Sequence, residues 1–213
     1  MVIIVFHFKD EQNNAILEHV STTFPDLTSI MYVINPKVND SIADLEVHLH
    51  KGRDYILEKM GTLQFRIGPK SFYQTNPQQA HELYKTVDRF AGFQGNEVVY
   101  DLYTGTGTIA LFIASRVKKV IGIEYNADAV ADANQNARQN SIENATFKAG
   151  DMKDILDTSF VRANETPDVI ITDPPRAGMH KDVVKAIQEI LPGRLIYVSC
   201  NPATQARDIG LLS

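Results

Sequence analysis

The chain has 213 residues, a net charge of −5 and one cysteine. This length fits one medium domain, or a domain of about 140–150 residues with a smaller one attached. A single cysteine excludes an internal disulfide and a multi-cysteine metal site, and it favours a reducing, cytoplasmic setting. The negative charge argues against a protein that coats nucleic acid through bulk charge, and no apolar run in the sequence is long enough for a membrane span.

The first 67 residues are predicted to form a small α+β segment. Residues 11–24 carry apolar side chains at helical spacing, and Asp10 is the expected cap of that helix. Strands are predicted at residues 2–8, 29–34, 46–50 and 63–67. His48 and His50 alternate along one of these strands and would share a face. Because no third ligand is nearby, a solvated sheet face is favoured and no metal site is predicted.

Residues 68–213 have a different pattern. Residues 68–76 form a connector, and Asn76-Pro77 starts a helix over 78–91 that Gly92 and Gly95 end. Strands then alternate with helices, with strands predicted at residues 98–100, 120–123, 146–148, 169–172 and 195–199, and helices after 107 and at 127–139 and 181–191. This alternation predicts an α/β fold with a parallel sheet covered on both faces, and ligands bind beyond the carboxyl ends of such strands.

Each predicted strand ends in residues that could serve a site. These are Asp101 with the Gly105–Gly107 turn, Glu124, Asp151, Asp173 and Cys200. The spacing Gly105-x-Gly107-x-x-Ala110, followed by Glu124, also fits the dinucleotide fingerprint. A dehydrogenase is nevertheless a distant alternative, because Asp101 would repel an approaching pyrophosphate.

The acidic rim better suits a ligand with a cationic centre, a ribose and an adenine, and S-adenosylmethionine is such a ligand. Glu124 would accept from the ribose hydroxyls, and Asp151 would lie near the adenine amino group. Asp101 and the amide of Gly105 would face the methionine end. For Asp101 and Asp151, capping of a helix is the competing interpretation.

Two further segments indicate the chemistry. In Asp173-Pro174-Pro175-Arg176 the prolines stiffen the loop, so Asp173 is held rigidly. Arg176 stands where amino-group methyltransferases favour an aromatic residue, and it offers a fork of donors to a base carbonyl or a phosphate. A lone cysteine is usually an inert small hydrophobe. Cys200, however, follows a strand on the same rim, where a thiolate could add to C6 of a pyrimidine and activate C5 for methylation.

Together these residues resemble a known family. The matching segments are SFYQTN (71–76), DLYTGTGT (101–108), VIGIE (120–124), AGD (149–151), DPPRAGM (173–179) and YVSCNPATQARD (197–208). Residues 68–213 resemble the bacterial RNA (uracil-5-)-methyltransferases, particularly the 23S rRNA type. The resemblance implies a Rossmann-like class I methyltransferase domain over 68–213, with residues 1–67 as part of a central domain.

The resemblance also implies the function and the site. It implies transfer of a methyl group from S-adenosylmethionine to C5 of a uridine in RNA, with Cys200 as the nucleophile and Arg176 near the target uracil. The implied cofactor contacts are Gln74, Tyr103, Gly105, Thr108, Glu124, Asp151 and Asp173. The substrate would be 23S rRNA, with tRNA as an alternative for the same chemistry.

Two departures from the family suggest a fragment. The family's N-terminal oligonucleotide-binding domain, often with iron–sulfur cysteines ahead of this region, has no counterpart in the sequence. The family's catalytic glutamate would lie beyond residue 213. We therefore expect this piece to bind cofactor without completing turnover. An RNA amino-group methyltransferase and a non-catalytic nucleotide- or RNA-binding module remain the alternatives, and the sequence defines no oligomeric state.

Overall fold

The computed structural model describes residues 1–212, which form two compact units. The first consists of Met1–Glu58 and Arg66–Ser71, and the second of Lys59–Phe65 and the chain from Phe72 onward. A two-stranded sheet of β4 (Ile56–Met60) and β5 (Leu63–Ile67) contributes residues to both units. Strand β4 was not predicted, and the predicted domain boundary at residue 68 stays a prediction.

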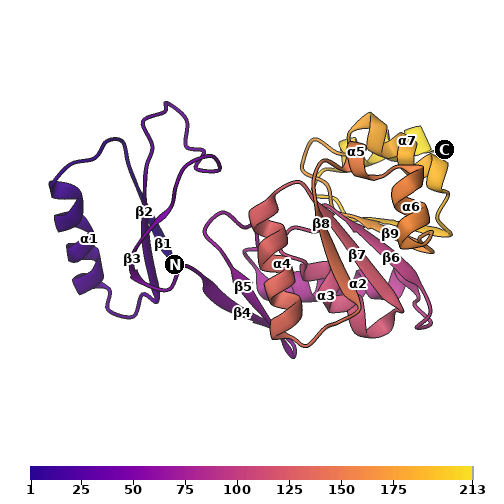
Figure 1. Ribbon diagram of the computed structural model, residues 1–213, viewed down its shortest axis with the longest axis horizontal. Coiled ribbons are helices and arrows are strands. Elements are labelled where there is room, and N and C mark those ends of the chain that lie inside the picture. Colours follow the sequence, from indigo (N-terminus) through magenta and orange to yellow (C-terminus); the bar gives the residue numbers. More distant parts are fainter. Residues whose placement is uncertain (213) are drawn as a thin grey trace. The chain divides into compact units, whose positions relative to one another are not determined.

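The first unit is a three-stranded sheet with one helix (Figure 1). Strands β1 (Val2–Phe6) and β2 (Ser29–Ile34) are parallel and are joined by α1 (Gln12–Thr23), while β3 (His48–Gly52) runs antiparallel to β2. Leu17 of α1 packs against Phe6 and Ile30 of the sheet. The N-cap is Glu11, which makes no side-chain cap, rather than the predicted Asp10; Asp10 lies one residue earlier, and its Oδ1 accepts from the Gln12 N–H at 2.7 Å. Strand β3 begins at His48 rather than at residue 46.

The two histidines of β3 have local partners. The His48 ring stacks on Tyr32 at 4.9 Å between centroids, and His50 Nε2 lies 3.3 Å from Glu18 Oε1. Among residues 1–212 there is no group of three or more His, Cys, Asp or Glu side chains that could hold a metal ion.

The second unit contains the predicted parallel sheet. Its five strands follow the order β10-β9-β6-β7-β8 and every pair is parallel. The strands are β6 (Val98–Leu102), β7 (Lys119–Glu124), β8 (Ala145–Ala149), β9 (Val169–Thr172) and β10 (Arg194–Tyr197). The chain builds outward from β6 to β8 and then returns to the other side of β6. The point between β6 and β9 is therefore the topological switch point, where open α/β sheets bind their ligands.

Helices cover both faces of this sheet. They are α2 (Pro77–Ala91), α3 (Thr108–Ile113), the short 3-10 helix η1 (Ala114–Arg116), α4 (Ala127–Gln139), α5 (Met152–Ile155), α6 (Thr158–Asn164), α7 (Lys181–Ile190) and α8 (Pro202–Leu212). Tyr100, Leu102 and Ile170 pack against residues of α5 and α7. These two helices lie close together in Figure 1. Helices α2, α3 and α4 pack on the opposite side of the strands. No described helix combines the length and apolarity needed to cross a membrane.

The predicted start and end of α2 are both present in the structure. Asn76 Oδ1 accepts from the Gln79 N–H at 3.1 Å, Pro77 takes the first position of α2, and Gly92 ends the helix in the left-handed conformation. Helices α5, α6 and α8 were not predicted. The same Asn-Pro signal precedes α8, where Asn201 Oδ1 accepts from the Ala203 N–H at 3.2 Å.

Gly122 in β7 provides a test of the packing behind the sheet. A Cβ there would lie 2.5 Å from Phe147 Cδ1 and 2.9 Å from Thr104 Cγ2. We expect Gly122→Ala to lower the free energy of unfolding of the full-length protein by about 1–3 kcal/mol, measured by urea denaturation. In Gly210→Ala the new methyl would meet nothing within 4 Å. A Gly210→Ala variant that loses as much stability as Gly122→Ala would contradict this explanation.

Candidate active site

Asp101 is the last residue but one of the central strand β6 and is 1% exposed. Its Oδ2 accepts from Thr104 Oγ1 at 2.6 Å and from the Ala110 N–H at 3.1 Å, so it caps the first turn of α3. Its Oδ1 has no hydrogen-bond partner among the described residues. Burial raises the pKa of Asp101 to about 7, and the nearby carboxylates of Asp173 and Glu124 add to this effect.

Glu124 ends the neighbouring strand β7 and links two turns. Its Oε2 accepts from the Gly105 N–H at 3.1 Å, and its Oε1 accepts from the Asn126 N–H at 2.9 Å. The carboxylate is thus fixed between the glycine turn that precedes α3 and the start of α4. Open space lies next to Gly105, since a Cβ there would contact nothing within 4 Å. A ligand can therefore approach this backbone closely.

A cavity of about 900 Å³ opens beside Glu124. Tyr103, Tyr125 and Asp151 line it, together with residues that follow β9, among them Met179. Tyr125 is 72% exposed and is one of the aromatic residues of the cavity wall. Asp151 also caps α5, because its Oδ1 accepts from the Lys153 N–H at 3.2 Å while Lys153 Nζ lies 3.1 Å from Oδ2. The ligand-facing and the capping interpretations of Asp151 are therefore compatible.

A second cavity, of about 350 Å³, brings Cys200 and Asp173 together. Gln74 lines it as well, and so do apolar side chains of α2 such as Val87 and Phe90. Burial raises the pKa of the Asp173 carboxyl. The charged form of Asp173 is thus less favourable here than it is in water.

Cys200 lies in the turn between β10 and α8, and its side chain is exposed. Ser199 Oγ accepts from the Asn201 N–H at 2.9 Å and donates to the Asn201 carbonyl at 3.0 Å, which fixes the backbone on both sides of the cysteine. The thiol is therefore accessible on an ordered turn.

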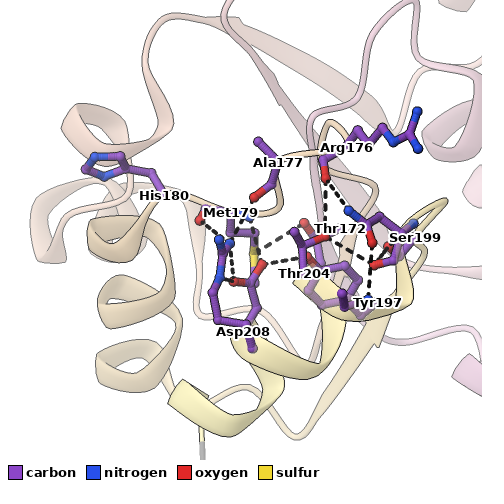
Figure 2. Close-up of polar contacts among 12 residues, drawn as sticks. Thr172, Arg176, Ala177, Met179, His180, Tyr197, Ser199, Thr204 and Asp208 are labelled. Carbon is purple, nitrogen blue, oxygen red and sulfur yellow. Dashed lines mark hydrogen bonds and ion pairs between the residues drawn. The ribbon is translucent and has the colours of Figure 1, made fainter.

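The remaining two predicted site residues, Thr108 and Arg176, line neither of these two cavities. Thr108 Oγ1 lies 3.0 Å from the hydroxyl of Tyr84, whose pKa burial raises to about 12. The carbonyl of Arg176 accepts from Asn201 Nδ2 at 3.1 Å and from Thr204 Oγ1 at 3.3 Å. Figure 2 shows the guanidinium of Arg176 pointing away from these contacts. It is therefore free to face a ligand outside the loop.

Sequence reasoning missed several residues of this region. They are Tyr125 and Gln205, which line the cavities, and Asn201, Thr204, Arg207 and Asp208, which contact the loop after β9. Tyr125 carried a signal, since it is an aromatic residue directly after a strand-ending acid. For the other residues, the sequence Asn201-Pro202 could have indicated that a helix begins there and carries them.

Comparison with known proteins decides the family. The model of the family described as tRNA (uracil-5-)-methyltransferase matches residues 46–213. The chain belongs to this family. An uncharacterized RNA methyltransferase of Bacteroides thetaiotaomicron is 54% identical over 216 residues, and one of Porphyromonas gingivalis is 56% identical over 214. Both alignments cover 100% of this chain but 48% and 46% of the relatives, so the chain spans about half their length.

Solved structures of the tRNA (uracil-5-)-methyltransferase family and of wider methyltransferases share the fold. The tRNA (uracil-54, C5)-methyltransferase of Pyrococcus abyssi, in complex with S-adenosyl-L-homocysteine, has a TM-score of 0.75 and 31% identity. That match covers 90% of this chain and 45% of the other. A putative methyltransferase of Streptococcus mutans has a TM-score of 0.60 at 13% identity over 94% of this chain and 55% of that protein, which shows the fold alone. The predicted Rossmann-like methyltransferase fold is thereby confirmed.

The raised pKa of Asp101 makes stability depend on pH. Between about pH 4 and pH 7 the folded protein retains a proton on Asp101 that the unfolded chain has released, so stability falls as pH rises through this window. Asp101→Asn removes that dependence. The prediction concerns the free energy of unfolding of the cofactor-free full-length protein, measured by urea denaturation. The difference between Asp101→Asn and wild type should shift in favour of the variant by on the order of 3 kcal/mol from pH 4 to pH 7.

An exposed aspartate provides the control for this profile. Asp40 is exposed in the first unit, and Asp40→Asn should leave the pH profile unchanged. If Asp101→Asn and wild type lose stability in parallel as pH rises, the buried carboxyl does not titrate in this window.

Proposed function

We propose that the full-length protein transfers a methyl group from S-adenosylmethionine to C5 of a uridine in RNA, with Cys200 as the nucleophile. The observation that carries this proposal is the shared cavity of Cys200 and Asp173, at the sheet edge that also holds Glu124 and the glycine turn. A cysteine, an acid and a cofactor-type turn are the parts that pyrimidine C5 methylation needs.

The acids at the strand ends fit this cofactor. S-adenosylmethionine supplies, when bound, a methyl group on a positively charged sulfonium. The unpartnered Oδ1 of Asp101 and the half-buried Asp173 gain a favourable charge partner when a cation is near. We propose that Glu124 accepts from the ribose hydroxyls and that Asp151 lies near the adenine amino group. The other cofactor contacts proposed are Gln74, Tyr103, Gly105, Thr108 and Asp173.

Cys200 supplies the activation that uracil needs. Its thiolate adds to C6, and the electron pair of the C5–C6 double bond moves to give an enolate. C5 of that enolate would then bond to the methyl carbon while the methyl–sulfur bond of the sulfonium breaks, and S-adenosylhomocysteine would leave with that electron pair. A base of the full-length protein removes the C5 proton, the double bond reforms and the C6–S bond breaks, which returns the thiolate.

The RNA substrate is proposed from the sequence. The motifs at 173–179 and 197–208 resemble the 23S rRNA type, so 23S rRNA is the substrate that we propose, with Arg176 placed near the target uracil. The family description and the Pyrococcus abyssi neighbour name tRNA, which is therefore the alternative. The test incubates the full-length protein with transcripts of 23S rRNA segments and tRNAs and identifies the product nucleoside. The proposal requires 5-methyluridine, and an amino-methylated nucleoside would contradict it.

Cys200→Ala tests the nucleophile. The variant should lose at least about a thousandfold in methylation rate, because C5 of uracil is then not activated, while its affinity for S-adenosylhomocysteine stays unchanged. RNA with 5-fluorouridine at the target should be trapped on the wild-type protein, because C5 then carries no removable proton. Mass spectrometry should locate this adduct on Cys200. Ser115→Ala, an exposed hydroxyl deletion, is the matched control. Methylation that survives in Cys200→Ala would favour amino-group transfer instead.

Glu124→Gln tests the cofactor site. The amide has one acceptor oxygen, so it cannot accept from both Gly105 and Asn126 and from ribose hydroxyls as the carboxylate can. We expect the affinity for S-adenosylhomocysteine to fall about 10–100-fold by calorimetry. Glu82→Gln, on the exposed side of α2, should bind as the wild type does. Equal affinities for all three proteins would remove Glu124 from the site.

A further inference from the structure

Asp208 of α8 is a buried carboxylate that the proposed chemistry does not use. It is 0% exposed, and both of its carboxylate oxygens accept hydrogen bonds. Oδ2 accepts from the Met179 N–H at 2.8 Å and from the Tyr197 hydroxyl at 2.6 Å. Oδ1 accepts from Arg207 Nε at 2.8 Å and Nη2 at 2.6 Å. One carboxylate thus joins the loop after β9, the end of β10 and helix α8.

The same loop is held at further points by the start of α8. Arg207 Nη2 donates to the Ala177 carbonyl at 3.0 Å, and the Arg176 carbonyl accepts from Asn201 and Thr204 as described above. Figure 2 shows the contacts of Asp208 with Met179 and Tyr197 and, beside them, those of Thr204 with Arg176. They connect the segment that follows Asp173 to the segment that follows Cys200. We call the four side chains Tyr197, Thr204, Arg207 and Asp208 the α8 clamp.

Gly178 shows how closely the loop approaches this clamp. Its φ is +82°, and a Cβ at this position would lie 2.5 Å from Arg207 Nη2 and 2.6 Å from Asp208 Oδ2. The absence of a side chain at residue 178 is what allows the Met179 N–H to reach the carboxylate. The loop and the clamp are therefore fitted to each other.

The charge of Asp208 is retained despite its burial. Burial alone would raise the pKa of its carboxyl, but hydrogen bonds from Tyr197, Met179 and Arg207 outweigh it and hold that pKa below the ordinary value. Hydrogen bonds to an ionised acceptor are stronger than neutral ones. The three attached segments are consequently held more firmly than a neutral side chain would hold them.

We propose that Asp208 is a positioning residue, which sets the geometry between the loop of Asp173 and Arg176 and the turn of Cys200. The assignment rests on the proposed function for the reaction that is positioned. Cys200 and Asp173 line one cavity, and Asp208 ties the two segments that carry them. A displacement of about 1 Å between reacting groups can cost on the order of a hundredfold in rate. The clamp should therefore act on the rate of reaction rather than on RNA binding.

The test compares Asp208→Ala, Asp208→Asn and Tyr197→Phe in the full-length protein at saturating S-adenosylmethionine. Asp208→Ala should lower kcat at least about tenfold, with less than about a threefold change in KM for RNA. Asp208→Asn keeps one oxygen for Met179 and Tyr197 and should recover part of that loss. Tyr197→Phe removes one hydroxyl and should give an intermediate kcat. Glu189→Gln, an exposed acid paired with Lys185 on α7, is the control and should match wild type.

Hydrogen–deuterium exchange separates this inference from the proposed function, because it needs no activity. Amides of residues 176–179 and 197–203 should exchange faster in Asp208→Ala and Tyr197→Phe than in Glu189→Gln. Unchanged exchange in Tyr197→Phe, or faster exchange with wild-type kcat, would overturn the positioning role. If Asp208→Ala does not fold, Tyr197→Phe and Asp208→Asn decide by the same criteria. A wild-type protein that makes no 5-methyluridine on any RNA would instead refute the proposed function.

Discussion

The parallel direction of the five strands is the constraint on which the site depends. It brings every strand's carboxyl end to one edge, and the reversal of strand order at β6 puts Asp101 next to the residues that follow β9. Burial raises the pKa of Asp101, and Asp173 and Glu124 lie close enough to add to this effect. No cation among the described residues offsets this crowding at Asp101, whose Oδ1 is unpartnered. Such an arrangement costs stability, and binding of the proposed cationic cofactor would offset that cost.

The two cavities differ in the strand ends that line them. The larger one is lined by Glu124 and Asp151, at the ends of strands on one side of β6, and by residues of the loop after β9 such as Met179. We propose that it holds the nucleoside part of the cofactor. The smaller one is built around Asp173 and Cys200 on the other side and suits a base. Asp101 lies at the end of the strand between them. The proposed methyl transfer would thus cross the switch point of the sheet.

Strand periodicity and strand-end chemistry made most of this arrangement readable from the sequence. The buried runs around Tyr100 and Ile170 predicted the sheet, and the acids that follow them predicted the rim. The α8 clamp was not predictable in the same way, because the hydrogen bonds of Asp208 join residues that are brought together only by folding. Its partners Met179 and Tyr197 lie 29 and 11 residues away in sequence. Strand β4 was missed because Glu58 and Lys59, residue types that are depleted in strands, interrupt its apolar pattern.

The close approach of Gly178 to the α8 clamp has a consequence for sequence variation in the family. A side chain at residue 178 would displace Arg207 and Asp208, and loss of the Asp208 carboxylate would leave the Met179 N–H and the Tyr197 hydroxyl without their acceptor. Residues 178, 197, 207 and 208 therefore cannot change independently. Homologues should either keep all four identities or replace them together, so covariation among these positions is a genetic signature of the clamp.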